Sequence, residues 1–141
     1  MSLDSIIRSN RHLVEVGVAT EDELAAVVGE VHVIGDVRGE IEDWHVIAIR
    51  DRVERTTSLH VLGRMLHSRG RLTSDVVMLA AERSVVRTQN SVYLLGEPAQ
   101  DLPTIEMLLT VAGALRSWGY DAAYGLDVPT EFEFAMRRRD V

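Results

Sequence analysis

Several residue types and patterns are missing from this 141-residue sequence, and each absence excludes a class of chemistry. There is no cysteine, which excludes disulfides, thiolate metal sites and cysteine nucleophiles. There is no lysine either, because all 15 cationic residues are arginine, and this excludes Schiff-base catalysis by lysine. No stretch approaches the roughly 18 consecutive apolar residues of a membrane-spanning helix.

The N-terminal residues do not have the basic-then-apolar pattern of a secretory signal. We therefore expect a cytoplasmic protein with no membrane partner, or a protein of the virion or host cytoplasm if a phage encodes it. The apolar fraction of 46% is that of an ordinary globular protein. The length suits a single domain, which we expect to span residues 1–141.

Charge is distributed unevenly along the chain. The net charge is −7, from 22 acidic residues and 15 arginines. Residues 1–54 carry a net charge of −7, residues 55–90 carry +4, and residues 91–141 carry −4. The expected surface is therefore acidic at both ends of the sequence and more basic in the middle.

Residues 1–29 are predicted to be helical. The apolar residues of the first half recur at roughly helical spacing: Ile6, Ile7, Leu13, Val14 and Val16. A second, short helix is predicted to begin at Thr20, because T-E-D-E is a capping box. In this arrangement the Thr20 hydroxyl accepts the Glu23 backbone N–H, while the Glu23 side chain reaches back to the Thr20 N–H.

Residues 30–97 favour short β-strands and contain an internal echo. The pattern apolar, His or Tyr, apolar, apolar, Gly occurs at residues 31–35, 59–63 and 92–96. V-x-R-T and a polar turn precede the last two copies. Such an echo is typical of one supersecondary unit used twice, although chance similarity is the alternative. We expect an antiparallel β-meander or small open barrel built from echoed hairpins. Residues 59–67 also fit helical spacing.

Residues 100–119 carry the clearest helical pattern. Asp101 is the predicted cap, Pro103 occupies the first turn, where a missing N–H costs nothing, and Gly119 ends the helix. One apolar face is expected to pack on the sheet: Leu102, Ile105, Leu108, Leu109, Ala112 and Leu115. Residues 120–141 form a tail with a predicted short helix from residue 130. The expected fold class is thus α+β.

The leading functional hypothesis is a small non-enzymatic interaction protein that binds a basic protein partner. The G-x-S-x-G, S-x-x-K and glycine-rich phosphate-loop motifs are all absent, and acidic charge steers cationic partners. An immunity, anti-defence or assembly role suits such a protein, with a phage or other mobile element as a candidate source and no cofactor. The candidate contact residues are Glu21, Asp22, Glu23, Glu40, Glu42 and Asp43.

Two alternatives belong to other functional classes. One is a nucleic-acid-binding module, in which arginines contact phosphates and aromatic rings stack on bases. The acidic net charge and the aromatic content of 5% disfavour it. Its candidate residues are Arg55, Arg64, Arg69, Arg71, Arg83, Arg87, Trp44 and Tyr93.

The other alternative is a metal-dependent hydrolase. His32 and His60 occupy the same place in two of the echoed segments, and a carboxylate such as Asp36 would complete a metal site without thiolates. Their spacing matches no known ligand signature, so a structural role is favoured for both.

A meander also leaves two sheet edges, and pairing one edge across a two-fold axis would give a homodimer.

Overall fold

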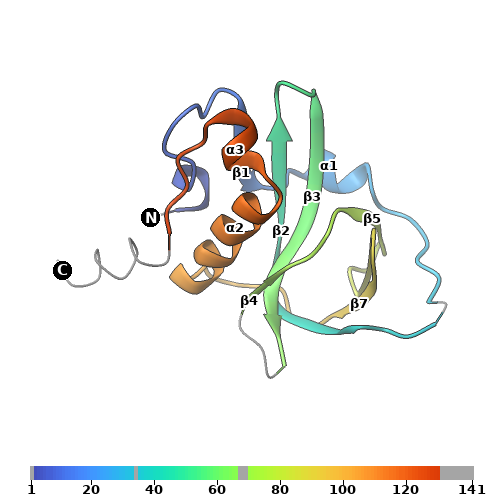
Figure 1. Cartoon of the computed structure of the whole chain (residues 1–141). Helices are drawn as coiled ribbons and strands as arrows, with labels where there is room; N and C mark the ends of the chain where they lie inside the picture. Colours follow the sequence, from blue (N-terminus) through green and yellow to red (C-terminus); the bar gives the residue numbers. More distant parts are fainter. Residues whose placement is uncertain (1, 34, 67–69, 131–141) are drawn as a thin grey trace.

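The computed structural model describes residues 2–33, 35–66 and 70–130. These residues form an α+β fold, mostly sheet with a few helices, as predicted (Figure 1). None of the helices within them is long and apolar enough to cross a lipid bilayer. The elements in chain order are η1 (Leu3–Ser5), β1 (Val14–Val18), α1 (Glu21–Ala25), β2 (Gly39–Asp51), β3 (Thr56–Met65), β4 (Gly70–Leu72), β5 (Val76–Leu79), β6 (Val85–Thr88), β7 (Val92–Leu95), α2 (Ile105–Ser117) and α3 (Tyr120–Tyr124).

The strands form one sheet around the long strand β2. The order is β4-β3-β2-β7-β6-β5, and β1 also pairs with β2. One edge of β2 pairs with β3. The other edge is divided, because its first residues pair with β7 and its last residues pair with β1. The β2–β7 pairing is parallel, so the sheet is mixed and differs from the predicted all-antiparallel meander. Strand β2 has 13 residues, so one of its edges can pair with both β7 and β1.

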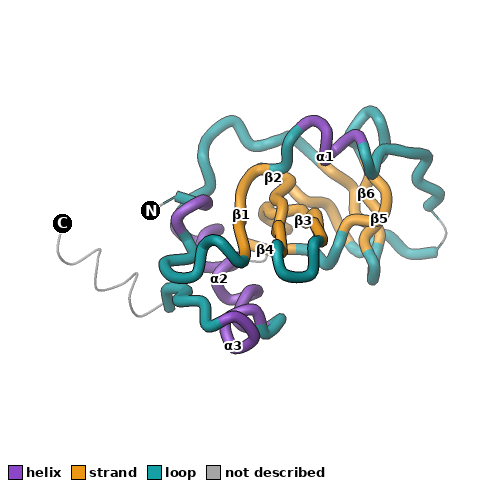
Figure 2. The backbone as a smooth tube through the Cα atoms, turned by 90° about the horizontal axis from the view of Figure 1, so that it is seen from above, coloured by secondary structure: helices purple, strands orange, loops and turns teal. Residues whose placement is uncertain are grey.

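Two hydrophobic cores lie on opposite faces of β2 and β3, because successive side chains of a strand point to opposite faces. Ile47, Ile49 and Leu62 join the first core, which α2 covers with residues such as Leu108 and Leu115. The second core is bounded by β5, β6 and β7. Its residues from β2 and β3 are Ile41, Trp44, Val46, Ala48, Leu59 and Val61. Figures 1 and 2 show α2 and α3 on one side of β2 and β3, with β5 on the other.

The predicted N-terminal helix was wrong, because part of this segment is strand β1. Val14 and Val16 are buried in the first core, while Glu15, which alternates with them along the strand, lies on the other face. V-E-V-G-V is thus a period-two pattern of β-branched residues, which favours a strand over a helix. Ile6 and Ile7 are buried as expected, but they follow the short 3-10 helix η1.

The capping box at the start of α1 is confirmed. The Glu23 backbone N–H donates to Thr20 Oγ1 (3.1 Å), and the Thr20 N–H donates to Glu23 Oε1 (2.9 Å). The helix is only five residues long. Beyond it the chain turns back to the sheet, where the Gly29 N–H donates to the Leu79 carbonyl of β5.

The echoed segments do not form equivalent hairpins. The second and third copies contribute to strands β3 and β7, so residues 59–65 are strand and not helix. The described residues of the first copy, 31–33 and 35, lie outside the strands, and Val33 is 52% exposed. Residues 53–55 lie in the β2–β3 turn and Thr56 begins β3, whereas residues 85–88 form the whole of β6. The shared sequence patterns therefore occupy different positions in the structure.

The C-terminal helix α2 packs on the sheet as predicted, but Asp101 is not its cap. Thr104 caps the helix, since its hydroxyl accepts the Met107 backbone N–H (3.3 Å). Gly119 follows the helix with a left-handed φ of +82°, which suits a residue without Cβ. The later start leaves Leu102 exposed and places Met107 and Val111 in the buried face. Beyond Thr130, the predicted tail helix lies outside the described residues.

Candidate functional site

Three of the predicted acidic contact residues lie in the first turn of α1. Glu23 accepts a hydrogen bond from Arg50 Nη2 (2.6 Å), and the Arg50 guanidinium lowers the pKa of Glu23 to about 2. Glu21 forms an exposed ion pair with Arg83 (3.2 Å). Asp22 is exposed beside them. Two of the three carboxylates therefore already have arginine partners within the chain.

The other three acidic residues lie near the start of β2. Asp43 has a left-handed φ of +50° and forms an ion pair with Arg64 (2.7 Å). Glu40 and Glu42 alternate along the strand, so both side chains lie on one face. Glu42 raises the pKa of Glu40, through a hydrogen bond between the two side chains and through charge repulsion. We call Glu40 and Glu42 the acidic pair.

The acidic pair lies beside the segment that follows β7. Glu42 Oε2 accepts the Glu97 backbone N–H (2.9 Å), and the Gly96 N–H donates to the Ile41 carbonyl (2.9 Å). A side chain at Gly96 would collide with the Glu42 carboxylate. These contacts fix the position of Glu42, while Glu40 is exposed. Figure 1 shows this start of β2 at the lower end of the β2–β3 hairpin and α1 nearer the upper end.

The two aromatic residues proposed for base stacking are buried. Trp44 is 8% exposed and donates its Nε1–H to the Gly96 carbonyl (2.9 Å). Tyr93 is 2% exposed, and the Arg71 guanidinium lies over its ring, 5.6 Å from the centre. Neither ring therefore offers a free face to a nucleobase.

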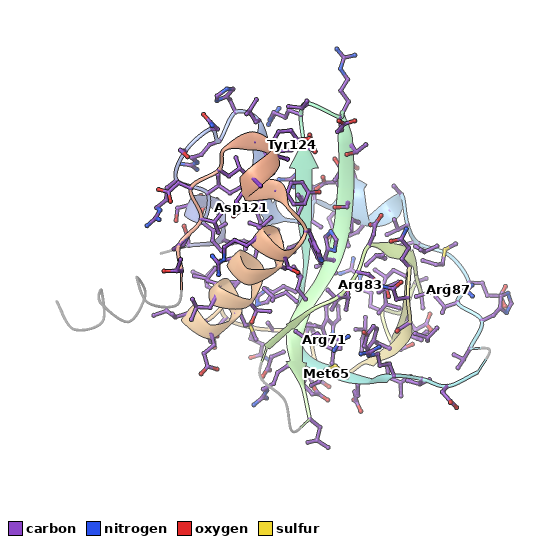
Figure 3. All side chains as sticks on the ribbon, viewed as in Figure 1. Met65, Arg71, Arg83, Arg87, Asp121 and Tyr124 are labelled. Carbon is purple, nitrogen blue, oxygen red and sulfur yellow. The ribbon has the colours of Figure 1, made fainter. Side chains whose placement is uncertain are left out.

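The six arginines proposed for phosphate binding are dispersed. Arg64 and Arg83 form the ion pairs with Asp43 and Glu21 given above. Figure 3 shows Arg83 and Arg87 on the side of β5–β7, and Arg71 lies toward the lower part of the β2–β3 hairpin. Arg55 lies in the β2–β3 turn, and Arg69 lies outside the described residues. The described arginines do not form one stripe.

The two histidines proposed as metal ligands have different surroundings. His32 is exposed in the segment between α1 and β2, whereas His60 is buried in β3. Both ring nitrogens of His60 already have hydrogen-bond partners. Across residues 2–33, 35–66 and 70–130, no group of three or more histidines, aspartates or glutamates could hold a metal ion.

An open cavity of about 390 Å³ lies beside His60, and the sequence did not reveal it. Residues from β3, the β4–β5 loop, the β6–β7 turn and the α2–α3 junction meet there. Its lining residues are Ser58, His60, Ser74, Asp75, Gln89, Asn90, Trp118 and Tyr120. We call it the His60 cavity.

Within the His60 cavity, the imidazole is held in one orientation. The Ser58 hydroxyl lies 2.8 Å from His60 Nε2, and His60 Nδ1 lies 2.9 Å from the Thr73 carbonyl oxygen. A carbonyl only accepts, so Nδ1 carries the proton and Nε2 accepts the Ser58 O–H. The Trp118 ring packs against the imidazole with a centroid distance of 4.9 Å. The sequence analysis predicted a polar turn before residues 59–63, whereas the structure has both Ser58 and His60 in β3. Because they are two residues apart on one strand, both side chains lie on one face.

Burial sets the protonation of the two ionisable rings in this cavity. Burial lowers the pKa of His60, which favours the neutral imidazole at pH 7. Burial also raises the pKa of Tyr120, and the negative charges of Asp51 and Asp75 add to that rise. Asp75 is itself anchored, since its Oδ1 accepts the Leu59 backbone N–H (3.2 Å). The cavity thus holds a neutral histidine, a neutral tyrosine and a carboxyl group.

Comparisons with known proteins supply no relative for either site. No protein-family model, curated protein or solved structure matches this chain.

Proposed function

We propose that this protein is an interaction protein that binds a basic protein partner at the acidic pair. The observation that carries the proposal is the contact between the Glu40 and Glu42 side chains, which raises the pKa of Glu40. Two carboxylates held together repel each other. A cationic side chain placed against them would relieve that repulsion.

The chemistry of the pair favours an arginine or lysine side chain over a metal ion. No third histidine, aspartate or glutamate completes a metal site among the described residues, and Glu42 is already used in part by the Glu97 N–H. A guanidinium presents several donors in a planar fork that suits adjacent carboxylate oxygens. A basic protein segment is therefore the occupant that fits, in line with an immunity, anti-defence or assembly role.

Among the six predicted contact residues, the contact between the Glu40 and Glu42 side chains supports the choice of these two. Glu23, Glu21 and Asp43 each have an arginine of the same chain as partner, so a partner protein would have to compete for them. Nucleic-acid binding is less favoured, because Trp44 and Tyr93 are buried.

An octa-arginine peptide with a fluorescent label provides the test. We expect the double variant Glu40→Gln/Glu42→Gln to weaken binding at least about tenfold in anisotropy titrations at physiological salt. The matched control Glu21→Gln/Asp22→Asn removes the same charge from α1 and should change the affinity less than about threefold. Equal losses in both variants would mean that only the overall charge attracts the peptide. No binding by the wild-type protein would also contradict the proposal.

A further inference from the structure

Ser58 and His60 have the arrangement of an activated serine. A hydroxyl becomes a useful nucleophile when a neutral base lies within hydrogen-bond distance and a third group orients that base. Here Ser58 Oγ is 2.8 Å from His60 Nε2, and the Thr73 carbonyl holds the opposite nitrogen at 2.9 Å. The main-chain carbonyl fixes the tautomer that leaves Nε2 free to take a proton. Burial of His60 keeps the ring neutral.

The cavity beside this serine has the size and lining of a small-molecule site. Its volume of about 390 Å³ lies in the range of small-ligand pockets. Trp118 and Tyr120 provide aromatic surface, whereas Gln89 and Asn90 add side-chain amides that can donate hydrogen bonds. Amide donors near a nucleophile stabilise the oxyanion that forms when a carbonyl is attacked.

The charge of the cavity limits the substrate class. Asp75 lines the cavity, and its negative charge contributes to the raised pKa of Tyr120. The same charge would repel a carboxylate or phosphate ligand. A neutral ester whose acyl group packs against the aromatic rings has no such penalty.

We propose that Ser58 is a nucleophile, with His60 as its general base, in the hydrolysis of small neutral carboxylic esters. This activity lies beyond the proposed partner binding and departs from the sequence-based expectation of a non-enzymatic protein. The G-x-S-x-G and S-x-x-K motifs belong to other folds. Here the serine and the histidine lie on one face because they are two residues apart on strand β3.

The reaction balances with water as the only co-reactant. Ser58 Oγ forms a bond to the carbonyl carbon while its proton moves to His60 Nε2. The bond from that carbon to the alcohol oxygen then breaks, and the leaving oxygen takes the proton from His60. A water molecule next attacks the acyl carbon as His60 accepts its proton. Ser58 Oγ leaves with that proton, which releases the carboxylic acid and restores both residues.

A fluorophosphonate probe and p-nitrophenyl butyrate test the proposal on the full chain. We expect the probe to label Ser58, as located by peptide mass spectrometry. Ser58→Ala, which removes only the hydroxyl oxygen, should abolish labelling and lower ester hydrolysis at least about tenfold. The matched control Ser84→Ala changes an exposed serine between β5 and β6, outside the lining of the His60 cavity, and should retain both signals. His60→Gln should slow labelling of Ser58 by a similar factor.

Three outcomes would overturn the proposal. The first is a folded wild-type protein that does not react at Ser58. The second is hydrolysis that survives in Ser58→Ala. The third is unchanged labelling of Ser58 in a folded His60→Gln variant, which would remove the role of the base. If His60→Gln fails to fold by circular dichroism, the comparison of Ser58→Ala with Ser84→Ala still decides the role of the serine.

Discussion

At the residue scale, the buried carboxyl group of Asp51 shows how this chain tolerates polar groups in its interior. Asp51 is 6% exposed at the end of β2. Its Oδ1 accepts the backbone N–H groups of Val53 (3.0 Å) and Glu54 (2.9 Å), and its Oδ2 accepts the Tyr124 hydroxyl (2.7 Å). A buried polar group is tolerated when its hydrogen-bonding capacity is satisfied. Asp51 thereby ties the β2–β3 turn to α3.

The Tyr124–Asp51 hydrogen bond should appear in the alkaline stability profile. The bond to Asp51 is the largest cause that raises the pKa of Tyr124 from 10 to about 12. A raised folded pKa stabilises the fold fully below pH 10, and this contribution is lost as the pH rises toward 12. The difference in melting temperature between wild type and Tyr124→Phe should therefore shrink across that window. If the difference in melting temperature stayed constant from pH 9 to pH 12, the Tyr124 hydroxyl would not donate a hydrogen bond to Asp51.

At the element scale, α1 is too short to be stable alone, and its first turn is held by contacts with the chain around it. Glu23 combines the capping box with the Arg50 ion pair, and Arg50 also binds Glu15 of β1 (2.7 Å). Because Glu23 and Arg50 side chains are only 20% and 21% exposed, this pair is less screened than a surface pair.

Replacement of Glu23 by glutamine isolates the charge of this pair. Glutamine can still accept the Thr20 N–H, so the variant removes the ion pair but not the capping geometry. We expect a loss of about 2 kcal/mol in the free energy of unfolding at pH 7, measured by urea denaturation. The folded pKa of about 2 lies below the ordinary value of 4.5. The stabilisation is therefore complete above pH 4.5 and disappears as the pH falls through 2.

Glu21→Gln is the matched control for the same turn of α1. Glu21 is 84% exposed and its partner Arg83 is 43% exposed. Exposed pairs of this kind contribute about 0–1 kcal/mol. A similar loss in the Glu21 and Glu23 variants would indicate that the helix dipole, and not the Arg50 pair, is responsible.

The elements that the sequence predicts correctly are those with local signals. T-E-D-E fixes the start of α1, and Gly119 fixes the end of α2. The parallel contact of β7 with β2 has no local signal, because it joins residues about fifty positions apart. The same holds for the His60 cavity, where Thr73 and Trp118 reach Ser58 and His60 only through the fold. The acidic pair lay within the predicted contact residues, but its separation from the ion-paired acids required the structure.

At the scale of the whole molecule, β2 and β3 make the two cores interdependent. Ile47 and Leu62 contribute to the core under α2, whereas Ala48 and Val61 contribute to the core bounded by β5–β7. Neither core can be lost without exposing one face of the same two strands. The predicted single domain therefore implies one cooperative unfolding transition.

Truncation of one residue in each core tests this coupling. Leu108 and Leu79 are each 1% exposed, in the first and second core. We expect Leu108→Ala and Leu79→Ala each to lower the free energy of unfolding by about 2.7–5 kcal/mol. Leu66 is 83% exposed and serves as the control. Leu66→Ala should change the free energy of unfolding by less than about 0.5 kcal/mol.

The two tryptophans distinguish one transition from two. Trp44 lies in the second core, and Trp118 packs on His60 at the end of α2. After incorporation of 5-fluorotryptophan, the two fluorine resonances can be followed separately during urea denaturation and assigned with Trp118→Phe. Because β2 and β3 serve both cores, both signals should share one midpoint in wild type, and Leu108→Ala or Leu79→Ala should shift them together. If Leu108→Ala moved only the Trp118 signal, the two cores would unfold independently and the chain would hold two cooperative units.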